Sequence, residues 1–307
     1  MREPYESEIA LAERLYPGPD WRGGRVAEGG QFHLVLVAEG RAVLRMARDA
    51  AQAADLVRRT ALVDALAAQL PFPVPRSLTG VWSATGPDDD GARRAQPDDG
   101  GPGRVVPAAV VQEFIDGAAH EPHTGDAATL RELLEALAAV DIVPLRHLLA
   151  PPFAYGGPWT ESKVAATLDA LGGHAPDAAT GAAAVVDAAR VLAALREFDD
   201  VPASLVHGDL AGHNVHWVGG RISGILDWDL AAAWDPALNV AYLAAWHGRD
   251  LVGALARDAD EARRARVWDG AMRLEVVYNA TLRTDAPDWP KLVRQAAPRL
   301  EDAAAAI

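Results

Sequence analysis

The segment from residue 205 to residue 229 places a tight β-hairpin directly after a polar loop, and it reads LVHGDLAGHNVHWVGGRISGILDWD. Val215–Val218 and Arg221–Leu226 are two apolar runs with the composition of strands. Gly219 and Gly220 separate them, and a glycine pair is a strong signal for a two-residue hairpin turn. The segment therefore predicts two antiparallel strands that bring the residues before and after the hairpin close together.

Three oxygen-bearing side chains flank this predicted hairpin. If the strands pair without interruption from the turn, Ile225 lies opposite Asn214 and Asp227 lies opposite Gly212. Asp209 stands at the start of the same loop. Two carboxylates and one amide oxygen then converge, and hard oxygen atoms of this kind suit Mg²⁺. One carboxylate remains available as a general base.

The composition excludes several classes of protein. There is no cysteine among the 307 residues, so disulfides, thiolate metal sites and cysteine nucleophiles are excluded. The net charge of −14 argues against nucleic-acid binding, which requires a basic surface. The acidic first residues lack the pattern of a signal peptide, and we find no apolar run of membrane-spanning length. We expect a protein that is not exported and has neither nucleic-acid nor membrane partners.

The pattern of predicted elements changes part-way along the chain. Strand-like runs at Phe32–Val37, Ala42–Met46 and Val105–Phe114 accompany one predicted helix at 50–70. Beyond these residues helices dominate, and we predict them at 127–140, 178–198, 239–246, 259–282 and from 291 onward. The expected fold class is therefore α+β, with a small antiparallel β-rich domain at residues 1–114 and a larger, mainly helical domain at residues 115–307.

The first domain contains two candidate anion-binding features. Gly29 and Gly30 precede a predicted strand, where a glycine pair lets backbone amides approach a phosphate closely. Such a pair also forms plain turns, which is the alternative interpretation. Arg45 lies within an apolar strand, where its side chain either extends to the surface or binds an anion on the face shared with the glycine turn.

The spacing of His207-Gly208-Asp209 relative to Asn214, with Asp227 following in ILDWD, resembles the catalytic loop and metal-binding aspartate of the aminoglycoside phosphotransferase family. Members are antibiotic kinases with a protein-kinase-like fold, and the order of a β-rich region before a helical region agrees with that fold. Three segments are similar to the corresponding sequences of the macrolide kinases: VLRMAR, LPFPVP and RISGILDWD. GGQFH and SGILDWD resemble kinases that inactivate basic peptide antibiotics.

The resemblance implies a bilobal protein-kinase-like fold that transfers the γ-phosphoryl group of ATP or GTP to a hydroxyl of an antibiotic. It makes Asp209 the catalytic base, and Asn214 and Asp227 the ligands of Mg²⁺. It makes the first domain the nucleotide-binding lobe and the second the catalytic and substrate-binding lobe. It also implies a cytoplasmic protein, monomeric or weakly dimeric, with a small-molecule substrate. It assigns nucleotide binding to Gly29, Gly30, Arg45, Gln112, Glu113 and Phe114.

The chain departs from the family pattern in its first domain. No lysine occurs before Lys163, so Arg45 stands where the family has a phosphate-binding lysine. Arginine binds a phosphate bidentately and does not lose its charge, so it is able to replace the lysine. The following helix has no glutamate to pair with this position, which leaves Asp55 or Asp64 as substitutes. A non-catalytic member that binds nucleotide is the alternative.

Three further residues near the loop have two interpretations each. His207 is interpreted as a structural residue that fixes the loop by hydrogen bonding, rather than as an acid or base. Asp229 either assists at the metal or caps a helix beginning near Ala231. Asp235, before Pro236, is interpreted as a brace of the site rather than as a substrate contact.

The acceptor is less determined than the reaction. Most of the excess negative charge falls after residue 114, and it suits a polycationic aminoglycoside or basic peptide; the carboxylates include Asp258, Asp260, Glu261, Asp269 and Glu275. The same region contains aromatic residues that either line a pocket for a macrolide or form core: Trp159, Trp217, Trp228, Trp234, Trp246, Trp268, Trp289, Phe153 and Tyr155. We favour an aminoglycoside, with a macrolide or basic peptide as the alternative.

Overall fold

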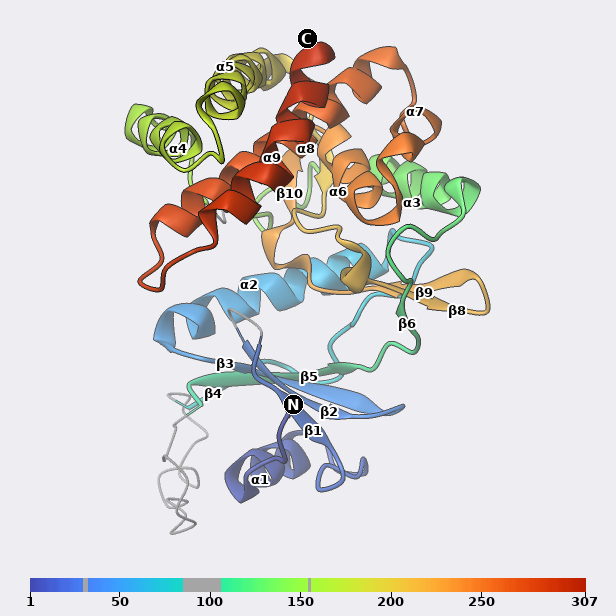
Figure 1. Cartoon of the computed structure of the whole chain (residues 1–307). Helices are drawn as coiled ribbons and strands as arrows, with labels where there is room; N and C mark the ends of the chain where they lie inside the picture. The colour runs from blue at the N-terminus through green and yellow to red at the C-terminus, as the bar shows by residue number, and fades with distance from the viewer. Residues whose placement is uncertain (30–32, 85–105, 154–155) are drawn as a thin grey trace. The chain divides into compact units, whose positions relative to one another are not determined.

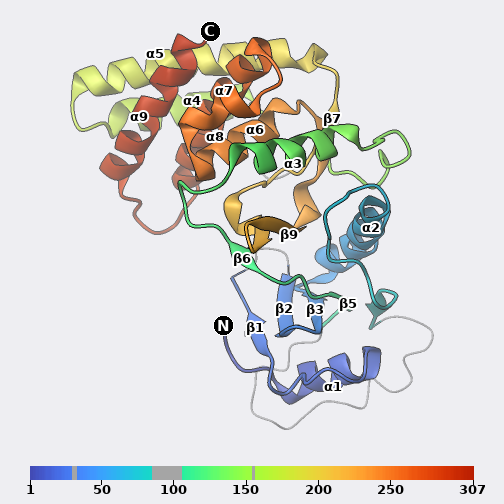
Figure 2. The ribbon, with the colours of Figure 1, turned by 90° about the vertical axis from the view of Figure 1, so that its right-hand side faces the viewer.

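The computed structural model describes residues 1–29, 33–84, 106–153 and 156–307. Contacts between Cα positions divide the chain into two compact units (Figures 1 and 2). Unit 1 comprises Met1–Ala119, Val143–Leu148 and Val215–Leu226. Unit 2 comprises His120–Ile142, Leu149–Asn214 and Asp227–Ile307. The predicted hairpin therefore groups with unit 1, whereas the polar residues before and after it belong to unit 2.

The centre of unit 1 is a five-stranded antiparallel sheet. Its strand order is β1-β2-β3-β5-β4. The strands are β1 (Arg25–Ala27), β2 (His33–Ala38), β3 (Ala42–Ala47), β4 (Trp82–Ser83) and β5 (Ala108–Glu113). β2 and β3 form a hairpin in which Ala38 pairs with Ala42, and β3 lies between β2 and β5. Val and Leu dominate these strands because their branched side chains pack well on a pleated surface.

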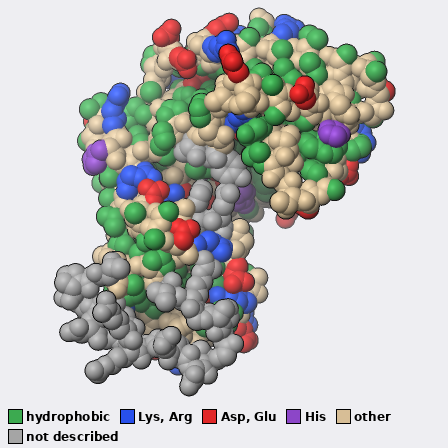
Figure 3. Space-filling view, turned by 90° about the vertical axis from the view of Figure 1, so that its left-hand side faces the viewer, with side chains coloured by type: hydrophobic (Ala, Val, Ile, Leu, Met, Phe, Trp, Pro, Cys, Tyr) green, Lys and Arg blue, Asp and Glu red, His purple; other side chains and the backbone are tan. Residues whose placement is uncertain are grey.

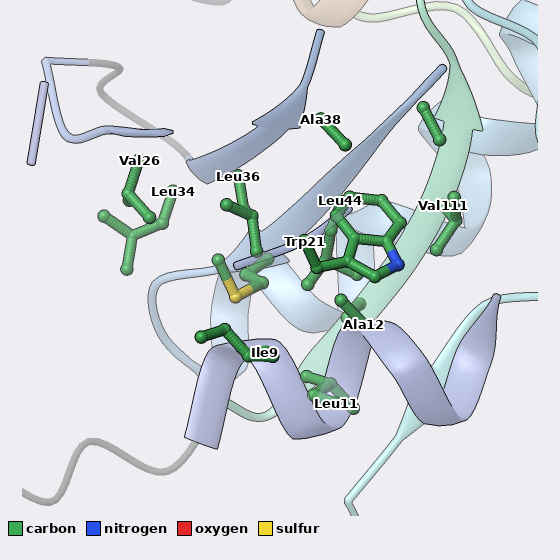
Figure 4. Close-up of a cluster of buried hydrophobic side chains, with 13 residues drawn as sticks. Ile9, Leu11, Ala12, Trp21, Val26, Leu34, Leu36, Ala38, Leu44 and Val111 are labelled. Carbon is green, nitrogen blue, oxygen red and sulfur yellow. The ribbon is translucent and has the colours of Figure 1, made fainter. Parts of the chain in front are cut away.

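Alternate side chains of this sheet pack against two helices, as the period of two requires. On one face, α1 (Glu6–Leu15) contributes Ile9 and Ala12 to a core with Leu44 of β3 (Figure 4). Trp21 is 1% exposed in the same core and donates a hydrogen bond from Nε1 to the carbonyl of Tyr16. On the other face, α2 (Ala50–Ala67) packs on β3 and β5.

A second sheet in unit 1 contains the predicted hairpin. β8 (Val215–Val218) and β9 (Arg221–Ile225) pair with each other, and β6 (Ala118–Ala119) pairs with β8. The predicted register is correct at the turn and wrong beyond it, because a β-bulge lies between His216 and Trp217. Ile225 therefore pairs with Val215 and not with Asn214. The residue without a pairing partner in the ladder is Ser223, whose hydroxyl donates to the carbonyl of Asp116 at 2.6 Å.

Unit 2 is mainly helical (Figure 1). Its α-helices are α3 (Ala127–Ala139), α4 (Glu161–Gly173), α5 (Ala178–Ala194), α6 (Ala237–His247), α7 (Val252–Leu255), α8 (Ala259–Thr281) and α9 (Trp289–Ala305). The longest, α8, packs against α4, α5, α6, α7 and α9. Strands β7 (Ser204–Val206) and β10 (Ala232–Trp234) form a small antiparallel sheet in the same unit.

One segment, Ala178–Asp200, is long and apolar enough to cross a membrane by length and composition alone. This differs from our expectation that no run of that length exists, and the alanine-rich composition of α5 accounts for the difference. One side of α5 is buried against α4, α8 and α9. Core helices of this kind pass the same test.

Candidate active site

The polar loop after β7 is held by a buried asparagine of α6. The Asn239 side chain donates from Nδ2 to the carbonyl of Leu205 at 2.9 Å and accepts the backbone N–H of His207 at 3.1 Å. His207 is fully buried and its ring lies 4.5 Å from that of Trp228. Its Nδ1 accepts the backbone N–H of Asp209. These contacts support the structural interpretation of His207, since each orients the loop.

Two glycines let the loop approach its neighbours closely. Gly208 has a φ of +84°, and a Cβ there would lie 2.3 Å from the carbonyl oxygen of Leu230. Any other residue would meet both backbone strain and a steric clash. Gly212 packs against the indole of Trp246, where a Cβ would lie 2.1 Å from ring atoms. Steric restriction therefore accounts for the glycines at positions 208 and 212 in this loop.

Asp209 and Asn214 are joined within this loop. The Asn214 side chain donates from Nδ2 to the backbone carbonyl of Asp209 at 2.8 Å and to its Oδ2 at 3.2 Å. Asn214 ends the 3-10 turn η3 (Gly212–Asn214) and is buried, whereas the Asp209 side chain is 34% exposed. The loop thus presents a carboxylate that a substrate hydroxyl can reach, oriented by an amide that is itself held in place.

Asp227 follows β9 with left-handed backbone angles, φ 56° and ψ 66°. A non-glycine residue rarely adopts this conformation, although aspartate and asparagine do so more readily than most. Strained backbone of this kind is concentrated at functional sites. Asp227 directly precedes the 3-10 turn η4 (Trp228–Leu230). All three predicted site residues belong to unit 2: Asp209, Asn214 and Asp227.

The donor set fits Mg²⁺ in its chemistry. Because Asn214 uses its amide nitrogen toward Asp209, its amide oxygen is the atom that can act as a ligand, together with the carboxylate of Asp227. Among the described residues, no group of three or more histidine, aspartate or glutamate side chains is placed to hold a metal ion. Mg²⁺ does not need such a cage, since it binds through one or two carboxylates and takes its other ligands from phosphates and water.

Two neighbouring aspartates, Asp229 and Asp235, are both buried. No helix begins near Ala231, since that residue leads into β10, so the helix-cap interpretation of Asp229 is wrong. Asp229 is 4% exposed within η4. Asp235 is 1% exposed and accepts hydrogen bonds from Nε of Arg264 and from Nε1 of Trp268, the latter at 2.8 Å. It joins α8 to the end of β10, as expected of a brace.

In unit 1, Arg45 lies on the α2 side of the sheet, because it alternates with Leu44 and Met46, which face α1. Its guanidinium lies 3.0 Å from Nδ1 of His33 on β2. The two aspartates expected to replace the family glutamate have other partners. Asp55 pairs with Arg58 and Arg59 at 2.9 and 2.8 Å, and Asp64 accepts two hydrogen bonds from Ser77.

The other nucleotide-binding candidates fall at the start of β2 and the end of β5. Gly29 has open space around its Cα, and Gly30 lies outside the described residues. The Gln112 side chain is buried and donates to the carbonyl of Pro75. The Glu113 N–H donates to the carbonyl of Arg76, and its carboxylate pairs with the Arg76 guanidinium at 2.6 Å. Phe114 is half-buried immediately after the strand.

The model of one protein family, described as the phosphotransferase enzyme family, matches residues 25–274 of this chain. The chain belongs to this family. The phosphotransferase is 33% identical over 282 residues to the viomycin phosphotransferase of Streptomyces vinaceus, an alignment that covers 85% of this chain and 88% of the relative. The family resemblance predicted from the loop motif is therefore confirmed.

Solved structures show the same fold. The GDP complex of an aminoglycoside 2'-phosphotransferase aligns with a TM-score of 0.62 at 15% identity, over 97% of both chains. A macrolide 2'-phosphotransferase from Brachybacterium faecium aligns with a TM-score of 0.57 at 19% identity, over 95% of this chain and 96% of that one. The predicted protein-kinase-like α+β fold is thus confirmed.

Five carboxylates of the phosphotransferase were named as candidates for attracting a cationic acceptor. Each of the five carboxylates singled out in the sequence has a partner: Asp258 caps α8, Asp260 pairs with Arg263 and Arg264, Glu261 with Arg257, Asp269 with Arg249 and Arg299, and Glu275 with Lys163. On the face of unit 2 shown in Figure 3, acidic side chains are scattered among hydrophobic ones. The excess of negative charge after residue 114 remains, but these five carboxylates are not its unpaired members.

Sequence reasoning did not single out Lys163 as a site residue. Its Nζ donates to the carbonyls of Gly156 and Gly157 at 2.8 and 2.9 Å, and to Oε1 of Glu275 at 2.6 Å. The side chain is 3% exposed. The available signal was compositional: in a chain whose cations are almost all arginine, Lys163 is one of only two lysines, the other being Lys291.

Proposed function

We propose that this phosphotransferase transfers the γ-phosphoryl group of ATP or GTP to a hydroxyl group of an antibiotic. The observation that carries the proposal is the Asp209–Asn214 pair, on a loop that Asn239 and Gly208 hold in one conformation. Phosphoryl transfer depends mainly on positioning and charge stabilisation, so a rigid loop with one accessible carboxylate suits it. The relatives named for viomycin, aminoglycoside and macrolide phosphorylation support an antibiotic acceptor.

In the proposed reaction the acceptor oxygen attacks the γ-phosphorus, and the bond from that phosphorus to the β,γ-bridging oxygen breaks. Asp209 accepts the hydroxyl proton, and the products are a phosphate ester and ADP or GDP. Asn214 and Asp227 are assigned to Mg²⁺, which when bound neutralises charge on the phosphates. Residues 1–114 are assigned to nucleotide binding, with Arg45 replacing the family lysine, and residues 115–307 to catalysis and acceptor binding.

A direct test is to incubate the full chain with ATP or GTP and a panel of antibiotics, and to detect a phosphorylated product by mass spectrometry. Asp209→Asn is expected to lower turnover by about 10²–10⁴-fold, the contribution typical of a general base, with nucleotide binding retained. Asp187→Asn on α5 is the matched control and is expected to behave as the unchanged chain. Equal turnover in all three proteins would refute the role of Asp209.

The alternative is a family member that binds nucleotide without transferring phosphate. The departures in unit 1 favour this alternative, since Arg45 replaces a lysine and both Asp55 and Asp64 have other partners. Nucleotide binding without any phosphorylated product across the panel would support it. The need for a nucleoside triphosphate accords with the expected cytoplasmic location.

A further inference from the structure

A pocket of about 460 Å³ lies entirely within unit 2, beside the catalytic loop. Gly208, the residue before Asp209, contributes to its lining, as do Leu230 and Ala232. Met272 and Val276 of α8 also line it. The volume is in the range of pockets that bind drug-sized molecules. An acceptor in this pocket would therefore lie next to the carboxylate assigned as the base.

One wall of the pocket is a fixed cluster of aromatic rings. The rings of Phe153 and Trp234 lie 4.4 Å apart in an edge-to-face arrangement, and those of Trp234 and Trp268 lie 4.9 Å apart in the same manner. Asp235 holds Trp268 in place through its indole nitrogen. Because the rings support each other and one is anchored by a buried hydrogen bond, the wall is preorganised for an apolar ligand face.

The pocket offers almost no negative charge. Among its described lining residues the charged ones are Glu275 and Arg283. Glu275 pairs with Lys163 through Oε1, and its Oε2 is buried without a hydrogen-bond partner among the described residues, beside Gly156, where a Cβ would lie 2.4 Å from it. Arg283 pairs with Asp285 outside the pocket. Neither oxygen of Glu275 is therefore both exposed and unpaired, as pairing with a ligand ammonium group would require.

Lys163 holds the second side of the pocket in place. Its ammonium lies 4.4 Å from the ring centroid of Trp159 and 5.0 Å from that of Tyr278. With its three hydrogen bonds it fixes the 156–159 turn, which contributes Gly156 and Trp159 to the lining, against α8. Lys163 is thus a positioning residue of the pocket and adds no charge to it, because Glu275 neutralises it.

We infer that this pocket is the acceptor site and that it selects a hydroxyl compound with a broad apolar ring face, neutral or with a single amine that stays in solvent, over a polycation. This inference rests on the proposed function for the identity of the site. Several ammonium groups would lose water here, and the described lining offers no exposed, unpaired carboxylate for them, which is unfavourable. An apolar face gains from burial against the aromatic wall.

Binding without nucleotide separates this inference from the proposed reaction. We would titrate the full chain with erythromycin, a macrocyclic lactone with one amine, and with kanamycin, and follow quenching of tryptophan fluorescence. Erythromycin is expected to bind and kanamycin is expected not to compete. Trp234→Ala is expected to weaken erythromycin binding by at least about tenfold, since it removes a large part of the apolar wall.

A pair of exposed valines gives a matched charge test. Val276 on α8 lines the pocket and is 42% exposed, whereas Val186 on α5 is 59% exposed and does not line it. Val276→Asp is expected to weaken erythromycin binding by about tenfold or more and to introduce binding of kanamycin. Val186→Asp is expected to leave both unchanged.

The outcomes distinguish the two claims. Erythromycin binding that depends on Trp234 and Val276, without any phosphorylated product from ATP or GTP, would uphold the pocket assignment and refute the proposed function. Phosphorylation of kanamycin together with failure of erythromycin to bind would uphold the function and overturn the inference. An unchanged erythromycin affinity in both Trp234→Ala and Val276→Asp would also overturn it.

Discussion

Replacing Lys163 by methionine removes an ammonium group while keeping most of the side-chain volume. In the native chain this ammonium makes three hydrogen bonds, one of them to Glu275 at 2.6 Å, with 3% of the side chain exposed. Loss of one partner of a buried ion pair leaves the other charge uncompensated, which costs about 3–5 kcal/mol. We use the lower figure, about 3 kcal/mol, because the Glu275 side chain is 22% exposed and retains some hydration.

For a folded region of this size, 3 kcal/mol corresponds to a fall in Tm of roughly 6–12 °C. The measurement is thermal and urea unfolding of the full chain followed by far-UV circular dichroism. Lys291→Met removes the only other lysine, which is exposed at the start of α9, and should change stability by no more than about 0.5 kcal/mol. The double variant Lys163→Met with Glu275→Gln should recover part of the loss, because no unpaired charge remains.

The loss should also depend on pH in a predictable direction. Burial raises the pKa of Glu275 above its ordinary value of 4.5, and Lys163 opposes that rise. A carboxyl whose pKa is raised in the folded state stabilises the fold below pH 4.5, and this contribution is lost as pH rises through the folded-state pKa. Removing Lys163 raises that pKa further. The stability difference between the two proteins should therefore be small near pH 4.5 and grow toward pH 8.

Two results would refute this reasoning about Lys163. A loss below about 1 kcal/mol at pH 8 would show that the pair behaves like an exposed one, since exposed pairs contribute about 0–1 kcal/mol. A loss of equal size at pH 5 and pH 8 would show that the hydrogen bonds to the 156–157 carbonyls, and not the charge of Glu275, carry the effect.

Three further substitutions test the loop and the nucleotide site. Arg45→Ala should raise the KM for ATP or GTP by about tenfold or more, measured by steady-state kinetics, as expected when a charged phosphate contact is lost; an unchanged KM would place the phosphate contact elsewhere. Gly208→Ala should cost about 2 kcal/mol or more because of its φ and the nearby Leu230 carbonyl, whereas Gly40→Ala, with a similar φ but open space, should cost only about 1 kcal/mol in urea unfolding. Asp227→Asn keeps a side chain that tolerates left-handed angles, so it should retain the native circular dichroism spectrum and lose transfer that added Mg²⁺ restores only in part; full activity at ordinary Mg²⁺ would exclude Asp227 as a ligand.

Local sequence patterns were enough to predict most helices and strands and to identify the family. The strands β2 and β3, with their hairpin, follow from two valine- and leucine-rich runs around a turn, and α8 follows from the run predicted at 259–282. The register of the second hairpin did not follow, because the bulge at Ser223 accompanies a hydrogen bond to Asp116, more than a hundred positions earlier. Sequence spacing does not reveal a tertiary contact of that kind. α4 also went unpredicted, although Val164, Leu168 and Leu171 have the spacing of one helix face.

The same limit applies to the site. The positions of Asp209, Asn214 and Asp227 follow from one motif because the spacing within a loop is encoded locally. In contrast, local sequence does not encode which carboxylates are available to a ligand. Glu275, for example, pairs with Lys163, which lies 112 positions earlier in the sequence. Net charge therefore suggested a polycationic acceptor, but it does not show which individual carboxylates already have a partner. Counting charges describes the surface potential, whereas specificity depends on which charges remain unpaired.

The small sheet of β7 and β10 connects the loop that carries Asp209 to the aromatic wall of the pocket. β7 leads directly into the loop that carries Asp209, and β10 ends at Trp234 in the pocket wall. Asp235, the next residue, anchors Trp268 and binds Arg264, so the aromatic wall and the catalytic loop share one rigid support. Val276, in contrast, lies on an exposed part of α8 and has no role in that support. A change of acceptor class is therefore expected from substitutions on α8 that leave the β7–β10 sheet intact, whereas substitutions at Asp235 should impair acceptor binding and turnover together.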